Sequence, residues 1–442
     1  MPQFSELRET REYLSEYRPR FRQPDAHALC SDSPFLTAEE TNEKVMELFT
    51  RHRDLASLPV LEGGRPIGLI NRDIFMSQMS QPFRHELYGR KSCIAFMDKE
   101  PLIVESSMDL ETLTFKAVAH GEKALADGFI ITRDGDFIGT GGGLQLMRAV
   151  AEVQAARNRQ MVHSIEYASV IQQSTLRASR EALQAVCPDA DLVWEPRDIV
   201  GGDFYQFCAA PDGWFATVAD CTGHGVPGAF MTLIASAALN QAVAQHGPRD
   251  PARLLAAVNR SIKQMLGQGE RTPDATGSDD GMDAAAFWFE PATGRLVFAG
   301  ARLSLFVWRP GAAALEIVEG QRKGVGYVES AFDFAWLDRE IVLPAGSLVF
   351  VTTDGLIDQV GGPRGIAFGK RRVLEILLRS LTADGQPDNP INPINPANPV
   401  NPVDAVTAIT AQQVNQAVLE GLRHWQGDNH RRDDLTFFCF RT

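Results

Sequence analysis

Four short aspartate-containing motifs, spread over more than half of the chain, limit the folds that this sequence can adopt. They read Gly-Gly-Asp-Phe-Tyr at 201–205, Ala-Asp-Cys-Thr-Gly-His-Gly at 219–225, Thr-Thr-Asp-Gly-Leu at 352–356 and Arg-Asp-Asp-Leu-Thr at 432–436. Each motif lies at or near the edge of an apolar run with the residue types of a β-strand, at 192–194, 214–219, 347–353 and 435–440. A fold that brings these strand ends together would place several rigidly held carboxylates around one point.

Carboxylates gathered in this way require cations. A hydrophobic core does not accept unpaired carboxylates, whereas hard divalent cations such as Mg²⁺ and Mn²⁺ take oxygen ligands. Glycines beside or just after Asp203, Asp220 and Asp354 let the backbone approach a metal ion or a phosphate closely. Each motif taken alone is also typical of an ordinary turn. Taken together, the motifs predict a two-metal site for phosphoryl hydrolysis.

In this order the motifs resemble those of the metal-dependent serine/threonine protein phosphatases of the PPM (type-2C) family, and within it the bacterial SpoIIE-like branch. The resemblance covers roughly residues 192–442, and the stretches 194–205, 220–233 and 361–372 are especially similar to SiaA-type phosphatases. It implies an α/β (α+β) fold for residues 188–442, an αββα sandwich of two antiparallel sheets flanked by helices.

The resemblance also implies roles for individual residues. Asp220 would bridge two Mn²⁺ or Mg²⁺ ions, and the backbone carbonyl of Cys221 would complete one coordination shell. Asp354 and Asp433 would bind from the other sheet, and Asp203 would ligate a metal ion directly or hold a water. The expected reaction is hydrolysis by a metal-activated water without a covalent intermediate.

Three further residues have two interpretations each. Asp434 either ligates a metal ion or only orients a water or a loop amide. His224 either protonates the leaving alkoxide or stabilises the turn in which it lies. Arg197 either forks onto the substrate phosphate or pairs with Glu195 or Asp198 on the surface.

Other phosphatase chemistries lack necessary residues. A cysteine phosphatase needs an arginine six positions after its nucleophile, and the chain has Pro227 after Cys221 and Trp214 after Cys208. The acidic stretch 279–283 lacks the spacing of an EF-hand, and we interpret it as a solvated loop.

Residues 21–149 contain the same pattern twice. Each copy consists of a helix, two strands joined by a glycine-containing turn, and a further helix. In the first copy these elements are expected at 37–51, 57–61, 66–70 and after 71–73, and in the second at 110–120, 127–132, 136–139 and from Leu144. This duplication resembles a tandem CBS pair, a regulatory module that often binds adenosine nucleotides.

The chain departs from the CBS ligand pattern in both copies. Asn71 replaces a hydroxyl residue in the first copy, and the second has the glycine run 141–143 with no acid beside it. Backbone amides of that run could cradle a phosphate, so an adenosine nucleotide stays a candidate ligand. A role in dimerisation and signal relay is favoured.

The module and the catalytic half are connected by residues 150–187, where apolar residues recur at helical spacing. We expect this helix to couple the module to catalysis or to pair with its copy in a homodimer. Residues 1–20 are typical of a charged amphipathic helix, and the Asn-Pro repeat at 388–403 of a polyproline-like or disordered insert.

Composition agrees with a cytoplasmic enzyme. The formal net charge of -13 argues against a nucleic-acid partner, and the most apolar segment, 230–243, is interrupted by polar residues. The first residues lack the apolar core of a signal peptide, and the six cysteines form no Cys-x-x-Cys pair.

These observations predict a cytoplasmic phosphatase, without membrane or nucleic-acid partners. Its expected substrate is a phosphorylated regulatory protein, a STAS-like anti-sigma-factor antagonist or a similar switch protein. The alternative is a nucleotide-sensing regulatory or binding protein with a weak or inactive phosphatase domain.

Overall fold

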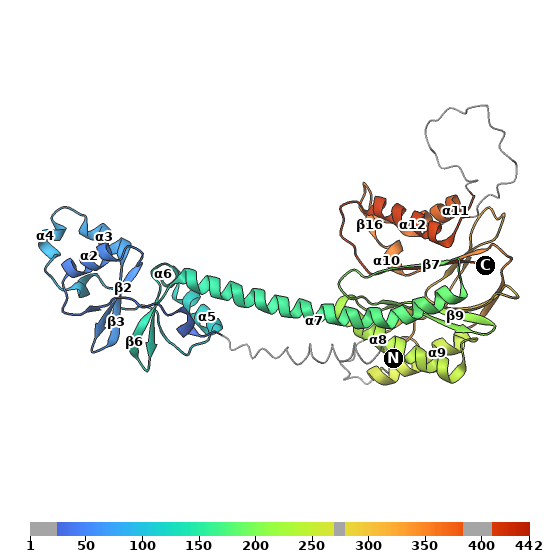
Figure 1. Cartoon of the computed structure of the whole chain (residues 1–442), viewed down its shortest axis with the longest axis horizontal. Coiled ribbons are helices and arrows are strands. Elements are labelled where there is room, and N and C mark those ends of the chain that lie inside the picture. The colour runs from blue at the N-terminus through green and yellow to red at the C-terminus, as the bar shows by residue number, and fades with distance from the viewer. Residues whose placement is uncertain (1–23, 269–278, 383–408) are drawn as a thin grey trace, which may run out of the picture. The chain divides into compact units, whose positions relative to one another are not determined.

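The computed structural model describes residues 24–268, 279–382 and 409–442, and the chain divides into two compact units, Met1–Met161 and Val162–Thr442 (Figure 1). The helix predicted at 1–20 and the Asn-Pro repeat at 388–403 lie outside the described residues.

The first unit contains the predicted duplication. In each copy a short strand runs parallel to the next strand, which forms an antiparallel hairpin with the third. The first copy comprises β1 (Leu36–Thr37), α2 (Asn42–Arg51), β2 (Ser57–Glu62), β3 (Arg65–Asn71) and α3 (Arg72–Met79); the second comprises β4 (Ile103–Glu105), α5 (Leu110–His120), α6 (Glu122–Asp127), β5 (Phe129–Arg133) and β6 (Asp136–Gly141). Short helices lie at η1 (Ala26–Leu29), α4 (Arg84–Tyr88) and η2 (Cys93–Phe96). The hairpin register shifts at equivalent places, between Val60 and Leu61 and between Ile131 and Thr132.

Two positions that correspond to the CBS ligand pattern make contacts within the protein. Asn71 caps α3 by accepting a hydrogen bond from the Ile74 amide (2.8 Å), and its amide group donates to Asp127 of the second copy. A Cβ added at Gly141 would lie 2.4 Å from the Phe129 ring. Close packing therefore accounts for a glycine in that run.

The predicted connecting helix is present as α7 (Gly143–Val186). In the first unit Leu146, with Val150 and Val153, packs on the core of the second copy. In the second unit Leu176 and Leu183 belong to the core of the sandwich. One helix thus contributes side chains to a core in each unit.

The second unit has the expected αββα architecture. One sheet has the strand order β14-β11-β10-β9-β8 and the other β13-β12-β15-β18-β7, with all neighbours antiparallel. The strands of the first sheet are β8 (Asp203–Ala210), β9 (Gly213–Cys221), β10 (Met282–Glu290), β11 (Arg295–Ala301) and β14 (Arg339–Val342). Those of the second are β7 (Ala190–Glu195), β12 (Leu305–Trp308), β13 (Glu316–Val318), β15 (Leu348–Thr352) and β18 (Leu435–Arg441).

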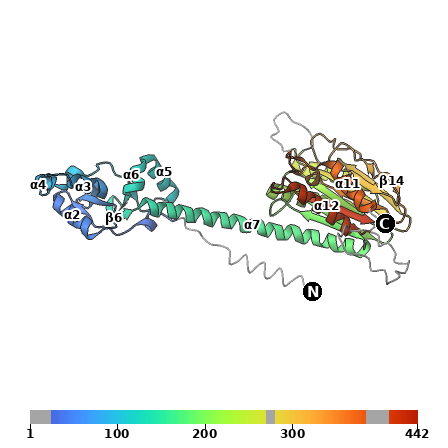
Figure 2. The same cartoon turned by 90° about the horizontal axis from the view of Figure 1, so that it is seen from above.

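Helices cover both outer faces of the sandwich. The helices α8 (Gly225–His246) and α9 (Pro251–Leu266) pack on the first sheet, and α11 (Gly369–Thr382) and α12 (Ala411–Gln426) lie over the second (Figures 1 and 2). The short elements α10 (Asp354–Ile357), β16 (Val360–Gly361) and β17 (Ile366–Ala367) follow β15.

Aromatic side chains fill the space between the sheets. Trp214 of β9 lies 4.8 Å, ring centre to ring centre, from Phe440 of β18, and Phe287 of β10 is stacked on the same ring at 5.7 Å. Because side chains alternate between the faces of a strand, every second residue of β9 from Trp214 to Asp220 points into this interior. The hydrophobic layer therefore leads directly to a carboxylate at one end.

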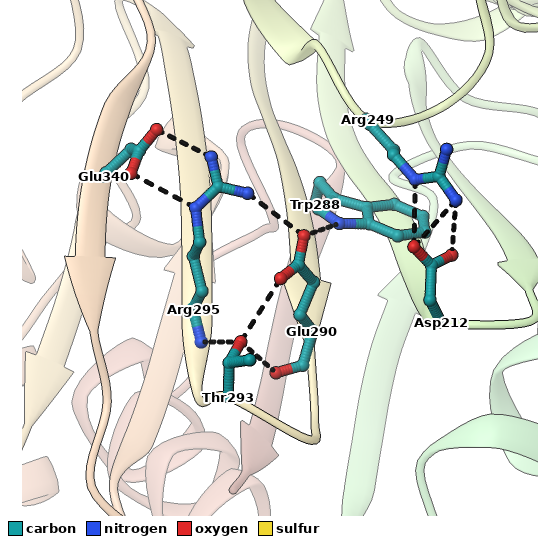
Figure 3. A network of polar contacts seen from close by, with 7 residues as sticks. All are labelled: Asp212, Arg249, Trp288, Glu290, Thr293, Arg295 and Glu340. Atoms are coloured by element: carbon teal, nitrogen blue, oxygen red, sulfur yellow. Dashed lines mark hydrogen bonds and ion pairs between the residues drawn. The ribbon is translucent and has the colours of Figure 1, made fainter.

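The outer face of the first sheet carries a polar network (Figure 3). Arg295 of β11 pairs with Glu340 of β14 (2.6 Å) and with Glu290 of β10 (3.0 Å), and Glu290 also accepts a hydrogen bond from the Trp288 indole (3.2 Å). Such cross-strand pairs contribute roughly 0.2–1 kcal/mol each. The network stabilises the sheet on the face opposite to the carboxylates.

By length and composition alone, α8 could cross a membrane, and it is the one such helix in the described part of the chain. In the structure Ala235, Ala238, Leu239 and Ala242 are buried in the core of the sandwich, and α8 packs against α9. The helix is a core element of this unit.

Candidate metal centre

Strand register brings three aspartates together at one end of the first sheet. Asp203 of β8 lies directly opposite Asp220 of β9, and Asp220 lies directly opposite Asp283 of β10. Directly opposed residues on antiparallel strands project from the same face, with Cβ atoms about 5 Å apart. Since Asp220 points between the sheets, all three carboxylates line the end of the sandwich interior.

The second sheet supplies the other side of the site. Thr353, directly after β15, donates a hydrogen bond from its hydroxyl to Asp203 Oδ2 (2.8 Å). Asp354 begins α10, and Asp433 and Asp434 directly precede β18. The structure therefore brings together all five predicted aspartates, from motifs that are far apart in the sequence.

Burial and mutual repulsion raise the pKa values of these carboxylates. Asp203 is 1% exposed, and its burial, reinforced by the charges of Asp434 and Asp354, raises its pKa to about 8 against the lowering effect of the Thr436 and Thr353 hydroxyls. Burial also raises the pKa of Asp220 well above its usual range, with Asp203, Asp354 and Asp433 adding to the effect.

The donor set fits hard divalent cations. Burial, with the charges of neighbouring carboxylates, raises the pKa of Asp354 as well as that of Asp220. Within residues 24–268, 279–382 and 409–442, no three His, Cys, Asp or Glu side chains already form a closed metal-binding group. Cations would offset the repulsion among these carboxylates, and all-oxygen ligands suit Mg²⁺ or Mn²⁺.

The motif glycines allow the loops of the centre to approach one another. A Cβ on Gly202 would lie 2.2 Å from the Gly223 carbonyl oxygen and 2.9 Å from that of Cys221. A Cβ on Gly355 would lie 1.9 Å from the Asp434 carbonyl oxygen. Any larger residue would separate the loops, so the glycines are needed for backbone packing around the carboxylates.

Asp434 orients a loop. Its two carboxylate oxygens accept hydrogen bonds from the backbone amides of Arg197 (2.6 Å) and Gly202 (2.5 Å). These bonds connect β18 to the segment that leads into β8 and Asp203. These contacts favour the interpretation that Asp434 orients a loop amide over the interpretation that it ligates a metal ion.

His224 and Arg197 lie at the rim of the centre. His224 Nδ1 is 3.0 Å from Asp198 Oδ2, and both side chains are about half exposed. Arg197 donates from Nη1 to the backbone carbonyl of Arg432 (2.9 Å), the residue before Asp433. The guanidinium is thereby held against the backbone of the segment that carries Asp433.

The alternative surface pairing of Arg197 is not observed. Glu195 pairs with Arg431 (2.6 Å) and Arg423 (3.4 Å), and Asp198 pairs with His224. Glu195 is more than 200 positions from both Arg431 and Arg423 in the sequence, so the local sequence could not indicate these two pairs.

Asp283 is a site residue that the sequence interpretation missed. The assignment of 279–283 to a solvated loop is wrong for its last residues, because β10 begins at Met282. Alternation was the available signal, since Asp283 continues the inward-facing series of Phe287 and Phe289 by steps of two. Burial, with a contribution from Asp354, raises the pKa of Asp283 to about 6, against the lowering effects of Arg302 and Tyr327.

Gln172 connects α7 to the centre. It is 4% exposed, and its side-chain amide both donates to the Gly201 carbonyl (2.8 Å) and accepts from the Gly201 amide (3.2 Å). It also donates to the Thr232 hydroxyl of α8 (3.1 Å). A single side chain of the connecting helix thus fixes the residue two positions before Asp203.

Comparisons with known proteins agree with this geometry. The family model described as Stage II sporulation protein E (SpoIIE) matches residues 210–412. The SiaA-PP2C domain of Pseudomonas aeruginosa is similar at 30% identity and a TM-score of 0.52, over 65% of this chain and 99% of that domain. A search of curated proteins finds no match.

Two further solved structures share less. The PP2C phosphatase domain of SpoIIE from Bacillus subtilis, with a fragment of its regulatory domain, has 14% identity over 57% of this chain and 63% of that one, at a TM-score of 0.41. The PPM Ser-Thr phosphatase MsPP from Mycobacterium smegmatis has 15% identity over 58% of this chain and 99% of that one, at a TM-score of 0.35.

The family assignment rests on the SpoIIE model and on the near-complete coverage of the SiaA domain. The chain belongs to the SpoIIE-type PP2C (PPM) family of metal-dependent serine/threonine phosphatases and is a protein phosphatase.

Proposed function

We propose that this phosphatase removes phosphate from phosphoserine or phosphothreonine on a small regulatory protein in the cytoplasm. The observation that carries the proposal is the convergence of Asp203, Asp220, Asp354 and Asp433 from the ends of both sheets at one partly exposed point. A phosphorylated side chain on the surface of a folded protein could reach such a point.

The carboxylates would hold two Mn²⁺ or Mg²⁺ ions. Asp220 lies opposite Asp203 and interacts with the charges of Asp354 and Asp433, and these four carboxylates would hold the ions together with the Cys221 carbonyl. When bound, the ions would supply an acidified water and offset negative charge on the phosphoryl oxygens. The chain's own contribution is to hold these oxygens in place.

Two rim residues would act on the substrate. Arg197, fixed by its bond to the Arg432 carbonyl, would direct its exposed N–H groups to the phosphate. Asp198 would accept a hydrogen bond from His224 Nδ1, and in the imidazolium form the second proton, on Nε2, would be given to the leaving serine or threonine oxygen, which leaves a neutral imidazole. The pair would thus supply a general acid.

We propose a STAS-like anti-sigma-factor antagonist, or a similar single-domain switch protein, as the substrate. Membership in the SpoIIE-type family and the similarity to the SiaA-PP2C domain support this choice. The negative net charge of the chain is compatible with a protein substrate that is recognised through a few basic rim residues.

The first unit, which resembles a tandem CBS pair, would regulate the centre through α7. Besides the Gln172 contacts, Ser179 of α7 accepts a hydrogen bond from the Phe207 amide (2.5 Å), and Arg180 donates to the Leu192 carbonyl (3.0 Å). A movement of α7 would therefore act on both sheets. We assign this unit to homodimerisation and signal relay, since Asn71 already bonds to protein partners.

The test compares two substrates for the full chain with Mn²⁺. We expect phosphate release from a phosphorylated STAS-domain protein with a much higher kcat/KM than for p-nitrophenyl phosphate. Hydrolysis of the small ester with the phosphoprotein left intact would contradict the proposal. Stabilisation by ATP without any phosphatase activity would instead support the nucleotide-sensing alternative.

A further inference from the structure

An arginine outside the four motifs contacts the additional carboxylate of the centre. Arg302 donates from Nη1 to Asp283 Oδ1 (3.2 Å) and from Nη2 to Glu329 Oε1 (2.8 Å). Its guanidinium lies over the Tyr327 ring at 4.6 Å from the ring centre. Three neighbours therefore fix the position of this positive charge.

The backbone also directs Arg302 to this place. It follows β11 with φ of +63°, a left-handed conformation that is uncommon for residues other than glycine. Its amide donates to the Gln321 carbonyl (2.7 Å), which holds the unusual conformation in a paired segment. On the other side of the contact, a Cβ on Gly324 would lie 2.7 Å from Asp283 Oδ1. The loop is thus closely fitted around the ion pair.

Asp283 adds a carboxylate to a centre that already has an excess of them. It projects from the same face as Asp220, directly opposite in register, and its charge interacts with that of Asp354. An unpaired carboxylate here would attract divalent cations and repel a phosphate dianion. Arg302 cancels this charge by direct contact.

We propose that Arg302 is a positioning residue that neutralises Asp283 and thereby balances the affinity of the centre for divalent cations against its affinity for phosphate. This inference rests on the proposed function, because it requires cations between the carboxylates. It assigns a role to an arginine and an aspartate outside the predicted ligand set.

Charge balance predicts opposite effects for the two partners. Arg302→Met leaves Asp283 unpaired, so Mn²⁺ should bind on the order of tenfold more tightly and inorganic phosphate should inhibit more weakly. Asp283→Asn removes one negative charge beside the centre and leaves Arg302 paired with Glu329 alone, so both shifts should reverse. The double variant should return close to the wild type.

The experiment measures the Mn²⁺ dissociation constant of the full chain by titration calorimetry and the inhibition constant of inorganic phosphate. Arg295→Met is the matched control, because Arg295, like Arg302, bonds to two carboxylates but lies on the outer face of the same sheet (Figure 3). Arg302→Lys keeps the charge and should bind Mn²⁺ like the wild type. If Arg302→Met does not fold, Asp283→Asn and Arg302→Lys still test the direction in which Mn²⁺ affinity and phosphate inhibition change.

The outcomes separate the two claims. Opposite shifts in Arg302→Met and Asp283→Asn, with no shift in Arg295→Met, would support the charge balance. Equal or same-direction shifts, with Mn²⁺ still bound by the wild type, would overturn it and leave the proposed function intact. A wild-type chain that binds no Mn²⁺ would contradict both.

Discussion

Thr353 and Asp203 are joined by a hydrogen bond of 2.8 Å that crosses from one sheet of the sandwich to the other at the metal centre. Asp203 is buried at the start of β8, and Thr353 directly follows β15. The Trp194 indole also donates to the backbone carbonyl of Asp203 (3.0 Å). The orientation of this carboxylate therefore depends on both sheets.

Thr353→Val should weaken metal binding while the chain stays folded. A hydrogen bond to a charged group contributes about 1.5–3 kcal/mol, so the Mn²⁺ dissociation constant should rise at least roughly tenfold. Thr352→Val is the matched control, since the Thr352 hydroxyl bonds only to backbone carbonyls. Titration calorimetry on both variants checks this, and equal effects would count against a specific role for Thr353.

Asp203→Asn should stabilise the metal-free chain at pH 8. The pKa of Asp203 is about 8 in the folded chain against 3.8 for an unperturbed aspartate, so between these values the folded state keeps a proton that the unfolded state has lost. Its contribution to stability is therefore fully present below about pH 4 and is lost as the pH rises through about 8. Asparagine removes this dependence.

Thermal unfolding with a chelator at pH 5.5 and pH 8 measures the effect. The wild type should melt at a lower temperature at pH 8 than Asp203→Asn does, with a smaller difference at pH 5.5. A variant that is less stable than the wild type at pH 8 would show that the carboxylate is not strained.

Metal binding should release protons. Asp203, Asp220 and Asp354 all have raised pKa values in the metal-free chain, and cations require the ionised forms. Affinity for Mn²⁺ should therefore increase from pH 6 to pH 8. Calorimetry in two buffers of different ionisation enthalpy counts the released protons, and a heat that is independent of the buffer would contradict the assignment.

Gln172→Leu should reduce phosphatase activity by tenfold or more without unfolding the sandwich. It leaves the buried amide and carbonyl of Gly201 without their side-chain partner, at a cost of about 1–3 kcal/mol for each group. Gln173→Leu changes the exposed neighbour on the same helix and serves as the control. Hydrogen exchange at residues 197–203 should accelerate in the first variant alone; unchanged exchange would remove the proposed coupling.

Local signals predicted helix α5 well. Asp109 caps it through its side chain, and it has the predicted bounds 110–120. The helix predicted at 37–51 begins only at Asn42, because Leu36–Thr37 pairs with β2 as a short strand. The strand β8 was not predicted, because its first residues were interpreted only as a motif around Asp203. Its nearly continuous burial also removes the alternation that identifies half-exposed strands.

The relations that complete the site are non-local. The sequence predicted that Asp203, Asp220, Asp354 and Asp433 would converge, because motif order and strand edges were visible. The Asp434 contact with Arg197 spans 237 positions, and it follows from strand pairing and loop packing that local sequence does not specify. Asp283 likewise became a site residue only through its register with β9.

The most direct test measures Mn²⁺-dependent phosphate release from a phosphoserine and phosphothreonine protein pool, with the wild type beside Asp354→Asn. Asp358→Asn, four positions later at the exposed end of α10, is the control. We expect activity in the wild type and the control, abolished by chelator, and its loss in Asp354→Asn. Full activity in Asp354→Asn, or phosphate release that survives the chelator, would contradict a catalytic centre built from these carboxylates.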